Sequence, residues 1–140
     1  MAKDGTEYLA NVGLFSALSK SELRQVARAA DRLDVQKGHE LVTQGRIGHE
    51  FFLILEGQAD VIRDGEKIAT LGPGQYFGEL SLLDHGARSA TVVAQTDMSL
   101  LVLGQREFSG LLETIPGMAA KLLVGMAHRL READARAVSH

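Results

Sequence analysis

The stretch Gly72–Val93 reads GPGQYFGELSLLDHGARSATVV, and the rest of the chain is organised around it. Glycines flank a short apolar turn, Leu80–Leu83, which follows directly on the carboxylate of Glu79. A helical turn that opens at Gly78 would point unpaired backbone N–H groups at a ligand, and such groups favour anions. Because glycine has no Cβ, the backbone can approach that ligand closely. The stretch predicts a site for a small anion, and we expect at least two of the three leucines of the turn to be core residues.

Two charged side chains indicate which class of anion would bind here. Arg88 follows Glu79 by nine residues, and its planar, permanently charged guanidinium can close over an anion with paired hydrogen bonds. A carboxylate beside an anion site is favourable only if it faces a neutral donor, such as a sugar hydroxyl. Together the two residues predict a ribose phosphate as the ligand.

Length and composition exclude several classes of protein. The 140 residues predict one domain, 1–140, and the net charge of −3 argues against broad binding to nucleic acid or to a membrane surface. The absence of cysteine excludes disulfides and thiolate metal sites. No apolar run is long enough to insert into a bilayer, and the N-terminus has no hydrophobic signal segment, so we expect a cytoplasmic protein.

Between residues 32 and 104 the chain consists of short β-prone segments bounded by turn signals. These signals recur every six to twelve residues, which is typical of an all-β sandwich or barrel. Asp64-Gly65 predicts a two-residue type I′ hairpin turn, because that turn needs positive φ at both central residues. The count reaches about eight strands, as in a jelly roll. Seven of them are the predicted segments 33–35, 40–43, 51–55, 59–63, 68–71, 89–94 and 98–103.

Helices are predicted on both sides of the strands. Ser19–Glu22 has the capping-box pattern, which predicts a helix over about 20–30, and a shorter helix is expected within 6–15. Gln105–Ile115 carries apolar residues at helical spacing and is ended by Pro116. A longer helix over 118–137 follows, with a stripe of Leu122, Met126 and Leu130. The predicted division is therefore helical 1–31, β-roll 32–104 and C-terminal helices 105–137.

The segment FGELSLL at Phe77–Leu83, followed by RSAT at Arg88–Thr91, resembles the phosphate-binding cassette of cyclic nucleotide-binding domains. This family includes domains of kinase regulatory subunits, cyclic-nucleotide-gated channels and a bacterial catabolite activator. The resemblance covers nearly the whole chain. It implies a mainly β fold: an eight-stranded jelly roll (a double-stranded β-helix) with N-terminal helices, a short phosphate-binding helix and two C-terminal helices.

The same resemblance implies roles for the residues of the cassette. Glu79 would accept a hydrogen bond from the ribose 2′-OH, and Arg88 would pair with the exocyclic phosphate oxygens. Ser89 would add a backbone N–H donor, and its hydroxyl can reach the phosphate. The further backbone contacts implied here are those of Gly78, Leu80, Ser81 and Ala90.

The resemblance also implies where the base lies. Val61 and Ile68 occupy the hairpin positions that line the apolar base pocket. Ala87 departs from the family pattern, which often has proline before the arginine, and the positions of the polar base contacts are Ala133 and Asp134 here. Arg129 or Arg131 on the last helix is the alternative base contact. The predicted ligand is cAMP, with cGMP as the second possibility, because serine at position 89 is compatible with a cAMP site.

A ligand-driven switch is the implied mode of action. The C-terminal helices would re-pack on the β-roll, and the last helix could mediate a homodimer or contact an effector protein. We expect no effector domain within this chain, which leaves two options open: a stand-alone sensor or an excised regulatory domain.

Three alternative functions would require other arrangements of residues. A cupin-like metalloenzyme would need clustered histidine and carboxylate ligands, for which His39-Glu40 and His49-Glu50 are the candidates. A hydrolase built on Ser81, Asp84 and His85 would crowd its residues into one turn without a nucleophile elbow. The third alternative is a protein-interaction module that binds no ligand. Such a module would not need the buried charges of Glu79 and Arg88, which are unfavourable unless they are paired. We therefore predict no enzyme, no metal and no cofactor.

Overall fold

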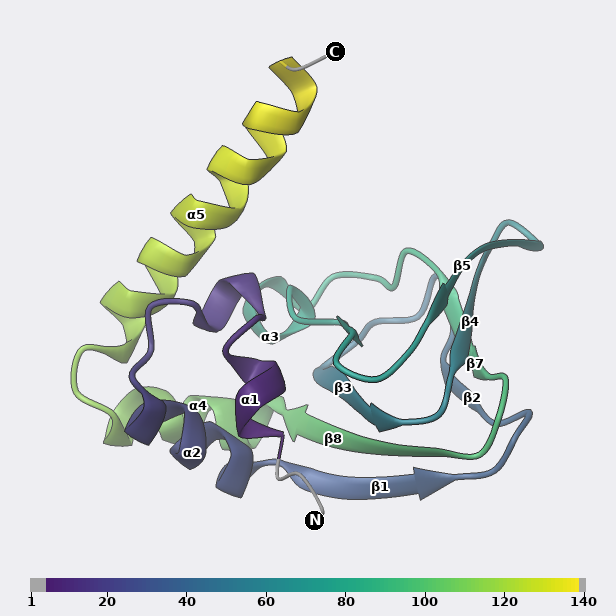
Figure 1. Cartoon of the computed structure of the whole chain (residues 1–140), viewed down its shortest axis with the longest axis horizontal. Helices are drawn as coiled ribbons and strands as arrows, with labels where there is room; N and C mark the ends of the chain where they lie inside the picture. Colours follow the sequence, from purple (N-terminus) through teal and green to yellow (C-terminus); the bar gives the residue numbers. More distant parts are fainter. Residues whose placement is uncertain (1–4, 139–140) are drawn as a thin grey trace.

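The computed structural model describes residues 5–138, so the predicted domain limits at 1 and 140 and the N-terminal segment 1–4 lie outside the described residues. Its strands are β1 (Asp31–Val35), β2 (Glu40–Val42), β3 (Glu50–Glu56), β4 (Ala59–Arg63), β5 (Glu66–Leu71), β6 (Tyr76–Phe77), β7 (Thr91–Ala94) and β8 (Met98–Gly104). They form two antiparallel four-stranded sheets in the orders β1-β8-β3-β6 and β2-β7-β4-β5 (Figure 1). The predicted jelly-roll class, mainly β with flanking helices, is confirmed.

The central strand β3 explains why its sequence is apolar without a break. Successive side chains of a strand point to opposite faces of the sheet. Phe52 and Ile54 are buried between the two sheets, whereas Phe51 and Leu53 are buried in a second cluster that includes side chains of the helices. A strand covered on both faces needs apolar residues at consecutive positions, because neither face meets water.

The helices are α1 (Thr6–Leu9), the 3₁₀ helix η1 (Gly13–Phe15), α2 (Lys20–Ala29), α3 (Ser81–Asp84), α4 (Gln105–Thr114) and α5 (Met118–Val138). Except for α3, they lie together at one end of the sheets, and α5 extends away from them (Figure 1). No single helix among residues 5–138 is long and apolar enough to span a membrane. Only α4 and α5 taken together, bent by 115° at the break between them, meet that length and composition.

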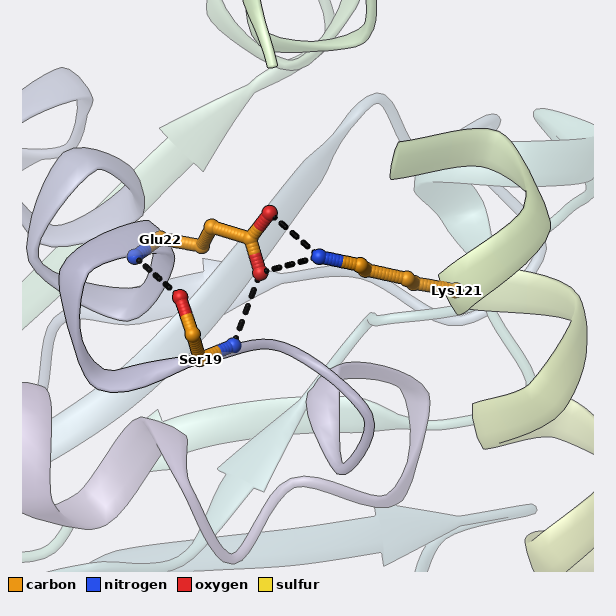
Figure 2. Close-up of polar contacts among 3 residues, drawn as sticks. All are labelled: Ser19, Glu22 and Lys121. Atoms are coloured by element: carbon orange, nitrogen blue, oxygen red, sulfur yellow. Dashed lines mark hydrogen bonds and ion pairs between the residues drawn. The ribbon is translucent and has the colours of Figure 1, made fainter. Parts of the chain in front are cut away.

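The predicted capping box at the start of α2 is present, and it is shared with α5. The backbone N–H of Glu22 donates to Ser19 Oγ over 3.2 Å, and the backbone N–H of Ser19 donates to Glu22 Oε1 over 2.8 Å. Figure 2 shows that Lys121 reaches the same carboxylate from α5, with Nζ 2.6 Å from Glu22 Oε2. The bond from Lys121, together with that from the Ser19 N–H, lowers the pKa of Glu22. This ion pair holds the N-terminal end of α5 against α2.

The structure differs from the sequence-based expectation in several local details. Strand β1 begins at Asp31, inside the predicted helical segment 1–31, and strand β5 begins at Glu66 instead of Ile68. Segment 6–15 forms two short pieces, α1 and η1, instead of one helix. Strand β6 lies inside the glycine-rich stretch, where no strand was predicted. Helix α3 begins at Ser81 because Gly78 has a φ of +84°, which a right-handed helix does not accept. Strand β7 begins at Thr91 instead of Ser89.

Two turn predictions have opposite outcomes. The hairpin turn between β4 and β5 has positive φ at Asp64 (53°) and Gly65 (81°), so the predicted type I′ conformation is confirmed. The expectation that at least two leucines of Leu80–Leu83 are core residues is wrong. Only Leu82 is buried, whereas Leu80 and Leu83 are 39% and 43% exposed. The turn lies at the surface of the fold, so only the side chain of Leu82 reaches the interior.

Helix α5 crosses η1 at a glycine. A Cβ on Gly125 would lie 2.7 Å from the carbonyl oxygen of Gly13 and closer still to that of Leu14. The two helices can approach this closely only because residue 125 has no side chain. His128, one turn further along α5, adds a hydrogen bond to Ser16 over 3.1 Å.

Gly125→Ala is expected to lower the free energy of unfolding by about 1–3 kcal/mol, the usual cost of forcing extra volume into a packed contact. The atoms in the way are backbone oxygens, which cannot swing aside as the end of a side chain can. Thermal or urea unfolding measures the loss. Gly110→Ala on α4 is the matched control, because its Cβ would meet no atom within 4 Å and alanine favours a helix by roughly 1 kcal/mol. Equal stability of the two variants would contradict the close packing of α5 on η1.

Candidate functional site

A cavity of about 380 Å³ opens between the cassette stretch, strand β4 and helix α5. It brings together nine of the ten residues predicted for the site, although they come from three separate parts of the sequence. Those nine are Val61, Gly78, Glu79, Leu80, Ser81, Arg88, Ser89, Ala90 and Arg129.

The guanidinium of Arg88 is held at the polar end of this cavity. Its Nη1 donates to Ser81 Oγ over 3.1 Å, its Nη2 donates to the carbonyl oxygen of Glu50 over 2.9 Å, and it lies 5.8 Å from the centre of the Phe52 ring. Burial lowers the pKa of Arg88, and the charge of Glu50 opposes that shift. Arg88 forms no ion pair within residues 5–138. A half-buried cation without a carboxylate partner is suited to an anionic ligand.

Two glycines make room for this guanidinium. A Cβ on Gly48 would lie 2.7 Å from Arg88 Nη2 and still closer to its Nε and Cζ. A Cβ on Gly78 would collide with Arg88 Nη1 and would lie 2.6 Å from the Glu50 carbonyl oxygen. Gly78 was predicted from its place in the cassette, but Gly48 was not, because 40 residues separate it from Arg88 in the sequence.

Glu79 is buried and is already paired. It is 8% exposed, and its Oε1 accepts a hydrogen bond from Arg129 Nη1, which reaches it from α5. Without this partner the carboxylate would be a buried, uncompensated charge, which is strongly unfavourable. The sequence pointed to Arg129 as a contact for a base, but the structure pairs it with the carboxylate of the cassette.

Ile68 is the predicted site residue that does not line the cavity. Val61 pairs with Ala69 and Ile62 pairs with Lys67, so Ile68 is the extra residue of a β-bulge in the β4–β5 hairpin. Its side chain is 49% exposed. The bulge changes the alternation of faces along β5, and the sequence did not reveal it.

Several cavity residues were not predicted. Arg63 lines the cavity two residues after Val61, and its Nε donates to the carbonyl oxygen of Ser89 over 3.2 Å. Because residues i and i+2 of a strand share a face, the position of Val61 could have identified Arg63. The remaining apolar wall residues come from other strands and were found only from the tertiary structure: Val42, Phe77 and Val92.

The residues of the two enzyme alternatives do not assemble into those sites. Among residues 5–138 no group of three or more histidine, cysteine, aspartate or glutamate side chains is placed to hold a metal ion. For a hydrolase, Ser81 Oγ would have to bond to His85. Instead it accepts from Arg88, Asp84 accepts from the Gly86 N–H over 2.9 Å, and His85 lies against His49.

Comparisons with known proteins agree with this geometry. A family model described as "Cyclic nucleotide-binding domain" matches residues 32–115. The chain is 36% identical over 126 residues to the cyclic AMP receptor protein of Thermus thermophilus, covering 86% of this chain and 58% of that protein. It is 37% identical over 105 residues to the cAMP-dependent protein kinase regulatory subunit of Schizosaccharomyces pombe, covering 74% of this chain and 26% of that subunit. The chain therefore spans less than two thirds of either curated relative.

A solved structure shows the same arrangement over almost the entire chain. It is the N-terminal domain of a transcriptional regulator from Streptomyces coelicolor, with 31% sequence identity and a TM-score of 0.83. The similarity covers 92% of this chain and 93% of that domain.

Proposed function

The chain belongs to the cyclic nucleotide-binding domain family, and we propose that residues 1–140 act as one sensor domain whose cavity binds cAMP. The observation that carries this proposal is the half-buried Arg88, a cation without a carboxylate partner among residues 5–138, at the end of a cavity that also holds the buried Glu79. The family is a binding and regulatory one, and the role proposed here is regulation by a ligand, not catalysis.

Arg88 supplies the contact to the phosphate. A cyclic phosphodiester is a monoanion, so one guanidinium neutralises it. At a separation of ~4 Å and an effective dielectric constant near 20, the attraction amounts to about 4 kcal/mol before desolvation. Ser81 and the Glu50 carbonyl hold the guanidinium in place beforehand, which reduces the entropy lost when the ligand binds. Gly78, Leu80, Ser89 and Ala90 line the same cavity, and their backbone groups are proposed as further contacts.

Glu79 supplies the contact to the ribose, and for this it must give up or share Arg129. The carboxylate has two oxygens, and Arg129 bonds to Oε1. A ribose 2′-OH that donates to this carboxylate weakens the hold of Arg129 on it. Binding at Glu79 therefore weakens the contact between the cassette and α5, which lets Arg129 turn toward the base.

The base is proposed to lie against the apolar wall formed by Val61, Val42 and Val92. cAMP is proposed as the principal ligand because Ser89 is compatible with it and because both curated relatives described above are named for cAMP. A cytoplasmic location accompanies this role, and cell fractionation tests it.

Arg88→Ala is expected to weaken cAMP binding more than tenfold, because truncating one partner of a buried charge pair costs about 2–5 kcal/mol. Titration calorimetry gives the affinity. Arg106→Ala is the control, since Arg106 is an exposed arginine on α4 that does not line the cavity. Unchanged affinity in Arg88→Ala would remove the phosphate assignment, and tighter binding of cGMP than of cAMP by the wild type would reverse the choice of ligand.

Cyclic AMP is expected to change hydrogen exchange in α5, because a ligand shifts a conformational equilibrium by its differential affinity for the two states. Amides near Arg129 should exchange at a different rate when Glu79 is engaged by ribose. Glu79→Gln, which removes the ion pair but keeps an acceptor oxygen, should raise exchange in α5 without ligand and should cost less affinity than Arg88→Ala. Identical protection with and without cAMP would reject the switch.

The outer part of α5 is proposed to pair with a second copy of the chain. Leu123 and Leu130 are 72% and 62% exposed, and a spacing of seven residues places them on one face of the helix. An effector protein is the alternative occupant. Sedimentation velocity should show a dimer that Leu123→Gln combined with Leu130→Gln converts to a monomer. A wild type that stays monomeric at high concentration, with and without cAMP, would exclude self-association.

A further inference from the structure

His49 and His85 are two histidines to which the proposed function assigns no role. His49 lies in the loop between β2 and β3, and His85 directly follows helix α3. Although they are far apart in the sequence, their rings lie against each other, with centroids 5.6 Å apart and ring planes inclined by 59°. His49 is exposed and His85 is half-buried, so the pair is accessible from solvent.

The backbone places the two histidines opposite each other. Ile47 and Ala87 form an antiparallel β-bridge between the β2–β3 loop and the cassette. In an antiparallel pair the partners advance in opposite directions along the chain. Two residues beyond this bridge, His49 is therefore opposite His85. Side chains of directly opposite residues have Cβ atoms about 4.5–5.5 Å apart and interact, which explains the ring contact.

The backbone at His85 is held in an uncommon conformation. Its φ of 52° and ψ of 33° lie in the left-handed region, which few residues other than glycine adopt. The turn is fixed by hydrogen bonds from the Gly86 N–H to Asp84 Oδ1 over 2.9 Å and from the Gly48 N–H to the Gly86 carbonyl oxygen over 3.2 Å. This turn sets the direction in which the His85 side chain leaves the backbone.

The ring nitrogens of this pair are available to a ligand. Neither ring forms a hydrogen bond or an ion pair within residues 5–138. By contrast, Nδ1 of His128 is hydrogen-bonded to Ser16 over 3.1 Å. A neutral imidazole binds metal ions through either ring nitrogen and is the commonest metal ligand in proteins.

The separation of the two rings suits one shared ion. An imidazole nitrogen lies about 2.0–2.1 Å from a bound Zn²⁺, and four-coordinate Zn²⁺ is tetrahedral. Two rings bound in this way have centroids roughly 5 Å apart, close to the 5.6 Å between His49 and His85. Binding an ion between them therefore needs no rearrangement of the backbone.

We propose that His49 and His85 form a two-histidine site for a divalent transition-metal ion of the class Ni²⁺, Cu²⁺ and Zn²⁺, with water as the remaining ligands. Imidazole nitrogen suits these ions, whereas Mg²⁺ and Ca²⁺ prefer oxygen ligands. Glu50 and Asp84, the neighbours of the histidines in the chain, add negative charge that favours a cation. The site differs from the metalloenzyme centre excluded above, which needs three or more ligands, and it departs from the sequence-based expectation of no metal.

An ion bound here would join the two segments that surround Arg88. The chain from the β2–β3 loop to the start of β3 brings Gly48 and the Glu50 carbonyl oxygen next to the guanidinium of Arg88. The ion binds only the folded arrangement in which the two histidines are adjacent, and such binding stabilises that arrangement. Hydrogen exchange of the amides in 46–50 and 84–88 should therefore become slower when the ion is added.

The test is a calorimetric titration of Ni²⁺ into the full chain without a histidine tag, at slightly alkaline pH because the metal needs neutral imidazole. The variants are His49→Asn, His85→Asn and the two combined, since asparagine also adopts the left-handed conformation of residue 85. Either single substitution should lower the Ni²⁺ affinity roughly tenfold or more, because one of two linked ligands is lost. The combined variant should lose little more, because a single imidazole already binds the ion weakly.

His39→Asn is the matched control. His39 is an exposed histidine beside β2 that has no ring contact with another histidine within residues 5–138, so its removal should leave the Ni²⁺ affinity unchanged. Equal losses in the three single variants, or a wild type that binds Ni²⁺ no more tightly than the combined variant, would overturn the proposal. Unchanged hydrogen exchange in 46–50 and 84–88 on addition of Ni²⁺ would also overturn it. These measurements contain no cyclic nucleotide, so the metal site and the proposed function can fail separately.

Discussion

The half-buried charge of Arg88 is the constraint on which the rest of the site depends. A guanidinium removed from water needs hydrogen-bond acceptors and space. Ser81 and the Glu50 carbonyl supply the acceptors, and the missing side chains of Gly48 and Gly78 supply the space. Three separate parts of the chain, the β2–β3 loop, the start of β3 and the cassette, are thereby arranged around one cation. Because none of these partners is a carboxylate, the charge remains available to an anion.

A second charge relation connects this site to the long helix. Glu79 is buried next to the cavity, and its counter-ion comes from α5, 50 residues away in the sequence. Further toward its start, α5 is tied to α2 by Lys121 and Glu22 and is packed on η1 through Gly125. The contact at Arg129 therefore differs from the others, because it is the one that ends on a group proposed to bind the ligand. This difference supports a model in which the N-terminal part of α5 stays fixed, while its contact at Arg129 changes when a ligand binds.

The cassette could be predicted from sequence because its residues are close together in the chain. Gly78, Glu79, Ser81 and Arg88 lie within eleven residues, so their mutual position follows from local geometry and from a pattern that a family shares. The residues that the β4–β5 hairpin places at the cavity could be predicted only in part. Val61 lines the cavity, but the bulge at Ile68 depends on the pairing between β4 and β5, which a single strand does not encode. Arg63 was overlooked, although it shares a face with Val61.

The sequence by itself determined the jelly-roll class, the capping box of α2, the type I′ turn at Asp64-Gly65 and the composition of the cassette. Each of these depends on periodicity or on the φ preferences of neighbouring residues, which are local properties. Only the tertiary structure decided that Gly48 adjoins Arg88, that Arg129 neutralises Glu79 and that Gly125 lets α5 approach η1. These contacts join residues tens of positions apart, and their energies arise from burial and charge pairing. Both exist only after the sheets and helices have packed together.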